Sequence, residues 1–119
     1  MTNQTINTSE ASQWVDVCDI NDLTPETGVC ALVGEQQVAI FYSGKLDQLF
    51  AIDNYDPIGK ANVLSRGIIG SIGERICVAS PLYKQHFDLT TGECLEQAEH
   101  RIRAYPVNLA GNRVQVGIR

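Results

Sequence analysis

Short runs of hydrophobic residues recur along most of the chain, separated by Gly, Pro, Asn and Asp. The runs are rich in Val, Ile, Phe and Tyr and are about eight to twelve residues apart, which is typical of strands in an all-β domain. The strands predicted from this pattern cover residues 14–17, 30–33, 38–42, 49–52, 75–79, 86–89, 93–95, 107–109 and 113–118. The pattern therefore predicts an all-β fold, built as an antiparallel sandwich or small barrel.

Three connections between these runs have the composition of tight turns. Gly34 with Glu35, Gly111 with Asn112, and residues 90–92 (Thr-Thr-Gly) each separate two predicted strands, and Gly supplies the positive φ that such turns need. The last strand alternates hydrophobic and polar residues, so we expect a half-buried strand at the edge of a sheet. Its hydrophobic positions are Val114, Val116 and Ile118.

Two segments fit no strand and are candidates for function. Residues 52–75 form a long, Gly-rich connection, and residues 80–85 follow directly after a predicted strand. Long loops inside compact domains often carry function. Because both segments follow an apolar strand, we expect them to lie side by side at one end of the domain.

Composition limits the classes of function. The chain has 119 residues, a length that fits one domain, which we place over residues 13–119. Its net charge is −5, and it lacks the clustered Lys and Arg residues that are typical of nucleic-acid-binding domains. No apolar run is long enough to cross a membrane, and the N-terminus has no secretory pattern, so we expect a cytoplasmic protein. Residues 1–12 are almost entirely polar and are predicted to be a disordered tail.

Four cysteines raise the question of a metal or disulfide site. Cys18, Cys30, Cys77 and Cys94 show no C-x-x-C spacing, and the first three lie in apolar runs. We expect free cysteines that behave as small buried hydrophobic residues.

The sequences FAIDNYDPIG, VLSRGIIG and ASPLYKQHFDLTTGECLE resemble the two cluster-binding loops of the Rieske-type ferredoxin family. The likeness extends over about residues 14–118. It implies a Rieske-type antiparallel β-sandwich or barrel with two apposed apical loops. In that family each loop supplies one Cys and one His to a [2Fe–2S] cluster.

This chain departs from the family at every ligand position. The resemblance places Asp56 and Ile58 in the first loop, and Ser80 and Tyr83 in the second, where the family has Cys and His. None of these side chains offers a thiolate or an imidazole, which the cluster requires. We therefore expect the chain to bind no cluster, metal or other cofactor.

The segments NVLSRGI and SPLYK also resemble a cluster-free group of Rieske-like proteins, the small subunits of cytoplasmic NADH-dependent nitrite reductase. The resemblance implies an accessory subunit whose partner is the large subunit. That partner is expected to carry FAD, siroheme and a [4Fe–4S] cluster and to reduce nitrite to ammonium with NADH. The alternatives are a stand-alone Rieske-type adaptor, or a ferredoxin-like component of another oxidoreductase.

The geometry of the family suggests a role for the altered loops. It places Ile58 and Tyr83 outside, near Tyr55 and Leu82, with Asp56 and Ser80 behind them as turn-capping residues. One hypothesis is that these apolar residues contact the partner subunit inside a basic rim of Lys60, Arg66 and Lys84. The other is that Ile58, Leu82 and Tyr83 fold inward and fill the space of the cluster. No catalytic residue is expected, because neither His86 nor His100 is placed to activate a nucleophile.

Overall fold

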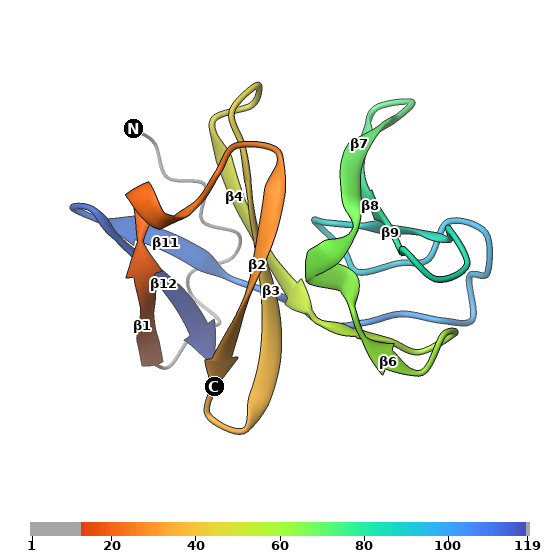
Figure 1. Ribbon diagram of the computed structural model, residues 1–119, viewed down its shortest axis with the longest axis horizontal. Helices are drawn as coiled ribbons and strands as arrows, with labels where there is room; N and C mark the ends of the chain where they lie inside the picture. Colours follow the sequence, from red (N-terminus) through yellow and green to blue (C-terminus); the bar gives the residue numbers. More distant parts are fainter. Residues whose placement is uncertain (1–12, 119) are drawn as a thin grey trace.

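A computed structural model describes residues 13–118 as an all-β chain, which confirms the predicted fold class (Figure 1). Two short 3-10 turns, η2 (Ile20–Asp22) and η3 (Leu64–Arg66), interrupt the strands, and neither is long enough to cross a bilayer. The strands are β1 (Gln13–Asp19), β2 (Thr27–Val33), β3 (Gln36–Ser43), β4 (Gln48–Asp53), β5 (Tyr55–Asp56), β6 (Ala61–Asn62), β7 (Ile68–Ile72), β8 (Arg75–Ala79), β9 (His86–Asp88), β10 (Ala104–Tyr105), β11 (Val107–Ala110) and β12 (Arg113–Ile118).

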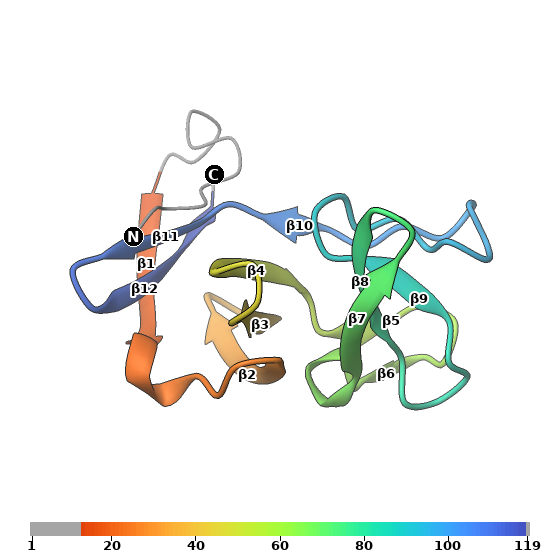
Figure 2. The same cartoon turned by 90° about the horizontal axis from the view of Figure 1, so that it is seen from above.

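The strands form three antiparallel sheets and one two-stranded pair. A four-stranded sheet with the order β10-β4-β3-β2 lies in the middle of the molecule, and a sheet with the order β1-β12-β11 packs on one side. The sheet β7-β8-β9 and the pair β5-β6 make up the other half, which is at the right in Figures 1 and 2. The two segments singled out from the sequence both lie in this second half.

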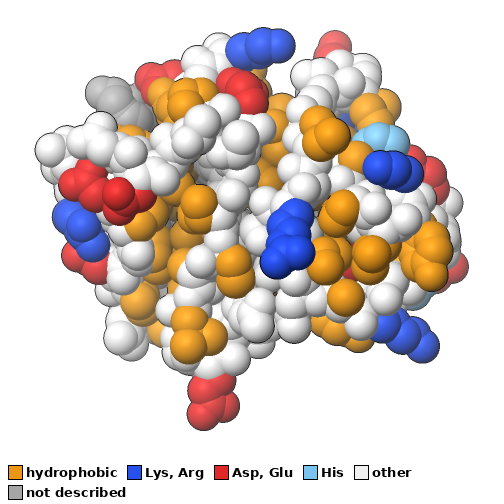
Figure 3. Space-filling model, viewed as in Figure 1, with side chains coloured by type: hydrophobic (Ala, Val, Ile, Leu, Met, Phe, Trp, Pro, Cys, Tyr) orange, Lys and Arg blue, Asp and Glu red, His pale blue; other side chains and the backbone are white. Residues whose placement is uncertain are grey.

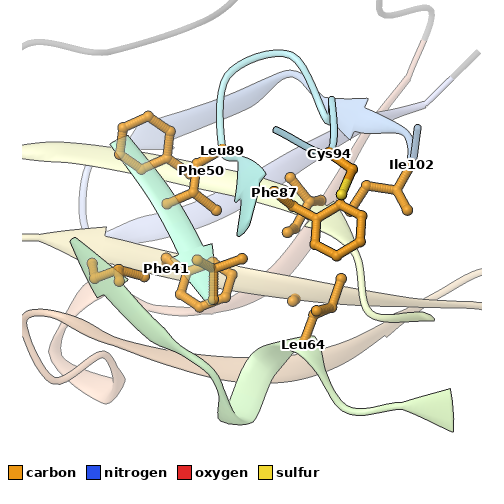
Figure 4. Packing of buried hydrophobic residues seen from close by; sticks show 11 residues of the cluster. Phe41, Phe50, Leu64, Phe87, Leu89, Cys94 and Ile102 are labelled. Carbon is orange, nitrogen blue, oxygen red and sulfur yellow. The ribbon is translucent and has the colours of Figure 1, made fainter. Parts of the chain in front are cut away.

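The two central strands of the middle sheet, β3 and β4, are buried on both faces, which explains their nearly continuous apolar sequences. In β3, Val38 and Ile40 face the core shared with β11 and β12, whereas Ala39 and Phe41 face the second core. All four side chains are fully buried. In the second core, Phe41 and Phe50 of the middle sheet pack against residues of the other half (Figure 4), namely Leu64, Phe87, Leu89, Cys94 and Ile102.

The predicted hairpin turns are present. Gly34 joins β2 to β3 and Gly111 joins β11 to β12, both with a φ of 63°. After β9 the chain turns at residues 89–91, where the N–H of Gly92 donates to the carbonyl of Asp88. The predicted strand over residues 93–95 is wrong as a regular strand, because Glu93 and Cys94 form only isolated bridges. The segment still lies along β9, since the N–H of Asp88 donates to the carbonyl of Glu93 and the N–H of Leu95 to the carbonyl of His86.

Two further expectations need correction. β12 is not an edge strand, since it pairs with β1 on one side and β11 on the other. Residues 52–75 are not a plain loop, because they contain β5, β6, η3 and β7. β7 was missed because its apolar run is interrupted by Gly70 and flanked by Gly67 and Gly73. The predicted tail of residues 1–12 lies outside the described part of the chain.

Candidate functional site

The two candidate loops have the same backbone shape. Each starts with a polar residue followed by Pro and ends four residues later with Lys: Asp56 to Lys60, and Ser80 to Lys84. The N–H of Lys60 donates to the carbonyl of Asp56 at 2.7 Å, and that of Lys84 to the carbonyl of Ser80 at 3.0 Å. Both lysines have a left-handed backbone, with φ of 60° and 66°. Each loop is therefore one closed turn that ends at a strained lysine.

The first side chain of each loop also closes its own turn. Asp56 Oδ1 accepts the N–H of Ile58 at 2.8 Å and that of Gly59 at 3.0 Å. Ser80 Oγ accepts the N–H of Leu82 at 3.3 Å. These are the local side-chain-to-backbone bonds that Asp and Ser make in turns. They fix the backbone of the residues that follow in each turn.

A direct hydrogen bond joins the two loops. Ser80 Oγ donates to Asp56 Oδ2 at 2.5 Å, and both residues are fully buried. Above this bond the loops pack closely, since a Cβ on Gly59 would collide with Leu82 and lie 3.0 Å from Asp56 Oδ2. The two loops therefore form one unit, which we call the loop tip and define as residues 55–60 and 80–84.

The first loop is anchored by the two residues before it. Asp53 accepts hydrogen bonds from Tyr105 Oη at 2.6 Å and from the N–H of Arg103 at 3.0 Å. Asn54 is buried, and its Oδ1 accepts the N–H of Ser65 in η3 at 2.7 Å. The tip is thus held by the middle sheet and η3 together.

Apolar side chains project from this anchored unit into solvent. Tyr83 is 64% exposed, Leu82 43% and Tyr55 40%. Ile58 behaves differently from the expectation that it faces outward: it is half-buried and packs against the second core.

Basic side chains lie around the exposed apolar ones. Lys60, Arg66 and Lys84 are all exposed, and within residues 13–118 none of them forms an ion pair. On the right-hand half of Figure 3, hydrophobic side chains lie among separate Lys and Arg side chains. Residues 54–85 contain four basic and two acidic residues, one of which is the buried Asp56, although the whole chain has a net charge of −5.

Reasoning from the sequence missed one exposed residue beside the tip. Ile68 is 75% exposed and pairs with Ala79, the residue before Ser80. It was missed because β7 was predicted to be loop. The shared pattern of the two turns, Pro-apolar-x-Lys after an Asp or Ser, was visible in the sequence and could have predicted their common shape.

The other candidate reactive groups are engaged elsewhere. His86 Nδ1 lies 2.6 Å from Glu96 Oε2. Burial raises the pKa of the Cys77 thiol to about 11, so almost no thiolate exists at neutral pH. Cys30 corrects the expectation of buried cysteines, since it is exposed on the edge strand β2.

The residues at the tip do not fit a [2Fe–2S] cluster. The positions that the resemblance assigns to Cys hold Asp56 and Ser80, which are bonded to each other, and those assigned to His hold Ile58 and Tyr83. A Rieske cluster needs two thiolates and two imidazoles. Among residues 13–118, no group of three or more His, Cys, Asp or Glu side chains is arranged to hold a metal ion.

Comparisons with known proteins agree with this fold. Residues 13–117 match the family model described as Rieske-like [2Fe–2S] domain. The chain is 48% identical to the nitrite reductase (NADH) small subunit of Escherichia coli K12, over 88% of this chain and 97% of that protein. The solved nitrite reductase [NAD(P)H] small subunit of Erwinia carotovora superposes with a TM-score of 0.76 at 46% identity, over 91% of this chain and 83% of that one.

A further relative shows the same domain within a longer chain. The nitrite reductase [NAD(P)H] large subunit of Klebsiella oxytoca is 41% identical over 104 residues, which are 87% of this chain but only 11% of that protein. Taken with the matched turns, the cross-loop hydrogen bond and the missing cluster ligands, these likenesses show that the chain belongs to the Rieske-like domain family and, within it, to the small subunits of nitrite reductase.

Proposed function

We propose that the loop tip is the surface through which this nitrite reductase small subunit contacts the large subunit. The observation that carries the proposal is the exposure of Tyr83, which is 64% exposed on a turn closed by two backbone hydrogen bonds. An aromatic side chain has few rotatable bonds and therefore loses little conformational entropy when a partner buries it. Such residues often contribute a large share of the binding energy.

The large subunit is the partner that the family suggests. In the Klebsiella oxytoca relative, a domain similar to this chain is part of a polypeptide named as the large subunit, so the two units act in one protein there. In our proposal the large subunit carries FAD, siroheme and a [4Fe–4S] cluster, takes electrons from NADH in the cytoplasm and reduces nitrite to ammonium. This chain then supplies no catalytic group and no cofactor.

The four apolar residues of the tip divide into two roles in this proposal. Ile58 packs on the second core and fills the space beneath the tip, whereas Tyr55, Leu82 and Tyr83 meet the partner. Lys60 and Lys84 lie at the ends of the two turns and have no ion pair within the described range, so they favour an acidic rim on the large subunit. Such charges speed association more than they strengthen the final complex.

The test compares two tip variants with a control. Tyr83→Ala is expected to weaken binding to the purified large subunit by about tenfold or more at an unchanged melting temperature. Ile58→Ala is expected to lower the melting temperature, because it removes core contacts. Leu46→Ala, in the exposed β3–β4 turn, is the control and should change neither. A Tyr83→Ala protein that binds like the wild type would contradict the proposal.

A further inference from the structure

Among residues 13–118, four residues other than glycine have a left-handed backbone. They are Glu26, Asp47, Lys60 and Lys84, with φ between 52° and 68°. This conformation is unfavourable for a residue with a Cβ, and it persists only where the surrounding structure or a function requires that side chain. Each of the four positions is therefore expected to have an interaction that compensates for the strain.

Two of the four are compensated within the chain. Glu26 Oε2 accepts the N–H of Gly44 at 2.6 Å and that of Lys45 at 3.1 Å. Asp47 Oδ1 accepts the hydroxyl of Tyr42 at 3.1 Å. Both side chains thus make hydrogen bonds to β3 or to the β3–β4 turn that a glycine could not make.

Lys60 and Lys84 have no such compensation. Each closes its turn through the backbone N–H, a bond that glycine would make equally well. Neither side chain forms a hydrogen bond or an ion pair within residues 13–118. Elsewhere the chain does use glycine at this conformation, since Gly34 and Gly111 both have a φ of 63°. The fold therefore does not explain why these two positions hold lysine.

Both lysines occupy the same place in two turns that are fixed to each other. The turns are joined by the buried hydrogen bond between Ser80 and Asp56, so the backbones of Lys60 and Lys84 are held at the two ends of the loop tip. A side chain on a backbone that is already fixed loses less conformational freedom on binding than one on a mobile loop. The two ammonium groups are thus suited to pair with carboxylates of a partner.

We propose that Lys60 and Lys84 are specificity-determining residues, each of which pairs with a carboxylate of the large subunit in the assembled complex. This inference rests on the proposed contact through the loop tip and adds which side chains select the partner. A charge at the rim of an interface acts mainly on the rate of association, whereas a charge paired in the final complex also slows dissociation. The strained backbone is retained because it holds the two lysines in place for this contact.

Replacement of each lysine by glycine separates strain from function. Lys60→Gly and Lys84→Gly should each raise the melting temperature of the free subunit by about 2–5 °C, because the strain is removed while the backbone hydrogen bond stays. Each should also speed dissociation from the purified large subunit by about tenfold, measured by surface plasmon resonance. Glu26→Gly is the matched control at the same backbone conformation. It should lower the melting temperature, because two hydrogen bonds are lost, and leave binding unchanged.

A relocated charge distinguishes a specific pair from general attraction. The double variant Lys60→Gly/Asn62→Lys restores the net charge of the loop tip at an exposed position two residues away. It should regain the association rate of the wild type at low ionic strength but still dissociate fast. Lys45→Gln, which removes an exposed lysine from the β3–β4 turn, should leave the dissociation rate unchanged.

Three results would overturn the proposal: glycine variants that dissociate like the wild type, glycine variants that melt at a lower temperature, or a relocated charge that restores slow dissociation. In each case, weaker binding of Tyr83→Ala would still support the loop tip as the contact surface. If Tyr83→Ala also binds like the wild type, the proposed contact itself is wrong. The two proposals therefore fail in distinguishable ways.

Discussion

Ser80 and Asp56 form a buried 2.5 Å hydrogen bond between two loops that have the same backbone shape. The bond lies where the family resemblance assigns the two cysteine ligands of the cluster. A bridge between the loops, provided in Rieske proteins by iron, is here made by a hydroxyl and a carboxylate. The tip therefore keeps its shape through hydrogen bonds of its own side chains.

The first prediction concerns this bond. Ser80→Ala removes the donor and leaves a buried carboxylate oxygen without its partner, which should lower the free energy of unfolding by about 1–3 kcal/mol. Chemical denaturation measures the change. Ser71→Ala, at an exposed position on β7, is the matched control and should change stability by less than about 0.5 kcal/mol. Equal stability of the two variants would mean that the cross-loop bond contributes nothing.

The second prediction concerns the contact between Gly59 and Leu82. In Gly59→Ala, the new Cβ collides with the end of the Leu82 side chain and lies 3.0 Å from Asp56 Oδ2, so Leu82 must turn out of its contact with the first loop. We expect the free energy of unfolding to fall by about 1 kcal/mol, measured by denaturation. Gly70→Ala is the control, since open space surrounds that position.

A double-mutant cycle identifies the cause of that loss. In a Leu82→Ala background the collision is largely removed. Gly59→Ala should therefore lower the free energy of unfolding clearly less in that background than in the wild type. If the cost is the same in both backgrounds, the two loops are not packed through these residues.

The sequence predicted much of the fold but not the positions of all strands within it. Alternation in β12 correctly predicted a half-buried strand, yet its pairing with β1, from the opposite end of the chain, leaves no local signal. Cys30 lies in an apolar run like the buried strands, but β2 is an edge strand, which leaves the thiol exposed.

The site was predictable to a similar degree. Asp56 and Ser80 could be assigned to turns from the proline that follows each of them. The bond between them could not, because it depends on how two sheets bring residues 24 positions apart together. β7 was missed because its glycines are typical of loops, although a Gly73-Glu74 turn closes its hairpin with β8.

A third prediction concerns stability in acid. Burial alone raises the pKa of Asp88, but hydrogen bonds from Arg75 and from the N–H groups of Thr91 and Thr90 outweigh it and hold the pKa below its usual value. A carboxyl with a lowered pKa in the folded state stabilises the protein above its unfolded pKa of about 3.9, and this stability is lost as the pH falls further.

Asp88→Asn tests this dependence. The variant should be less stable at pH 7 by about 1.5–3 kcal/mol, because a charged hydrogen bond is lost. It should also lose less of its remaining stability than the wild type when the pH is lowered below about 4. Unfolding curves measured across this range give both quantities, and parallel curves for the two proteins would contradict the assignment.

A fourth prediction concerns thiol reactivity. Cys30 is exposed, whereas Cys77 and Cys94 are buried and the pKa of Cys77 is raised to about 11. In the native protein at neutral pH, a thiol reagent should therefore modify Cys30 first and leave Cys77 and Cys94 unmodified. Mass spectrometry of the peptides identifies the site, and Cys30→Ser should remove the fast phase. Early modification of Cys94, which belongs to the second core, would show that this core opens readily.

The most direct test of the proposed contact is photo-crosslinking from the loop tip in the assembled enzyme. A photoreactive amino acid at position 83 is expected to crosslink to the large subunit, whereas the same group at position 46 is not. Crosslinks from position 46 but not from position 83 would show that the large subunit binds another face, and would contradict the account.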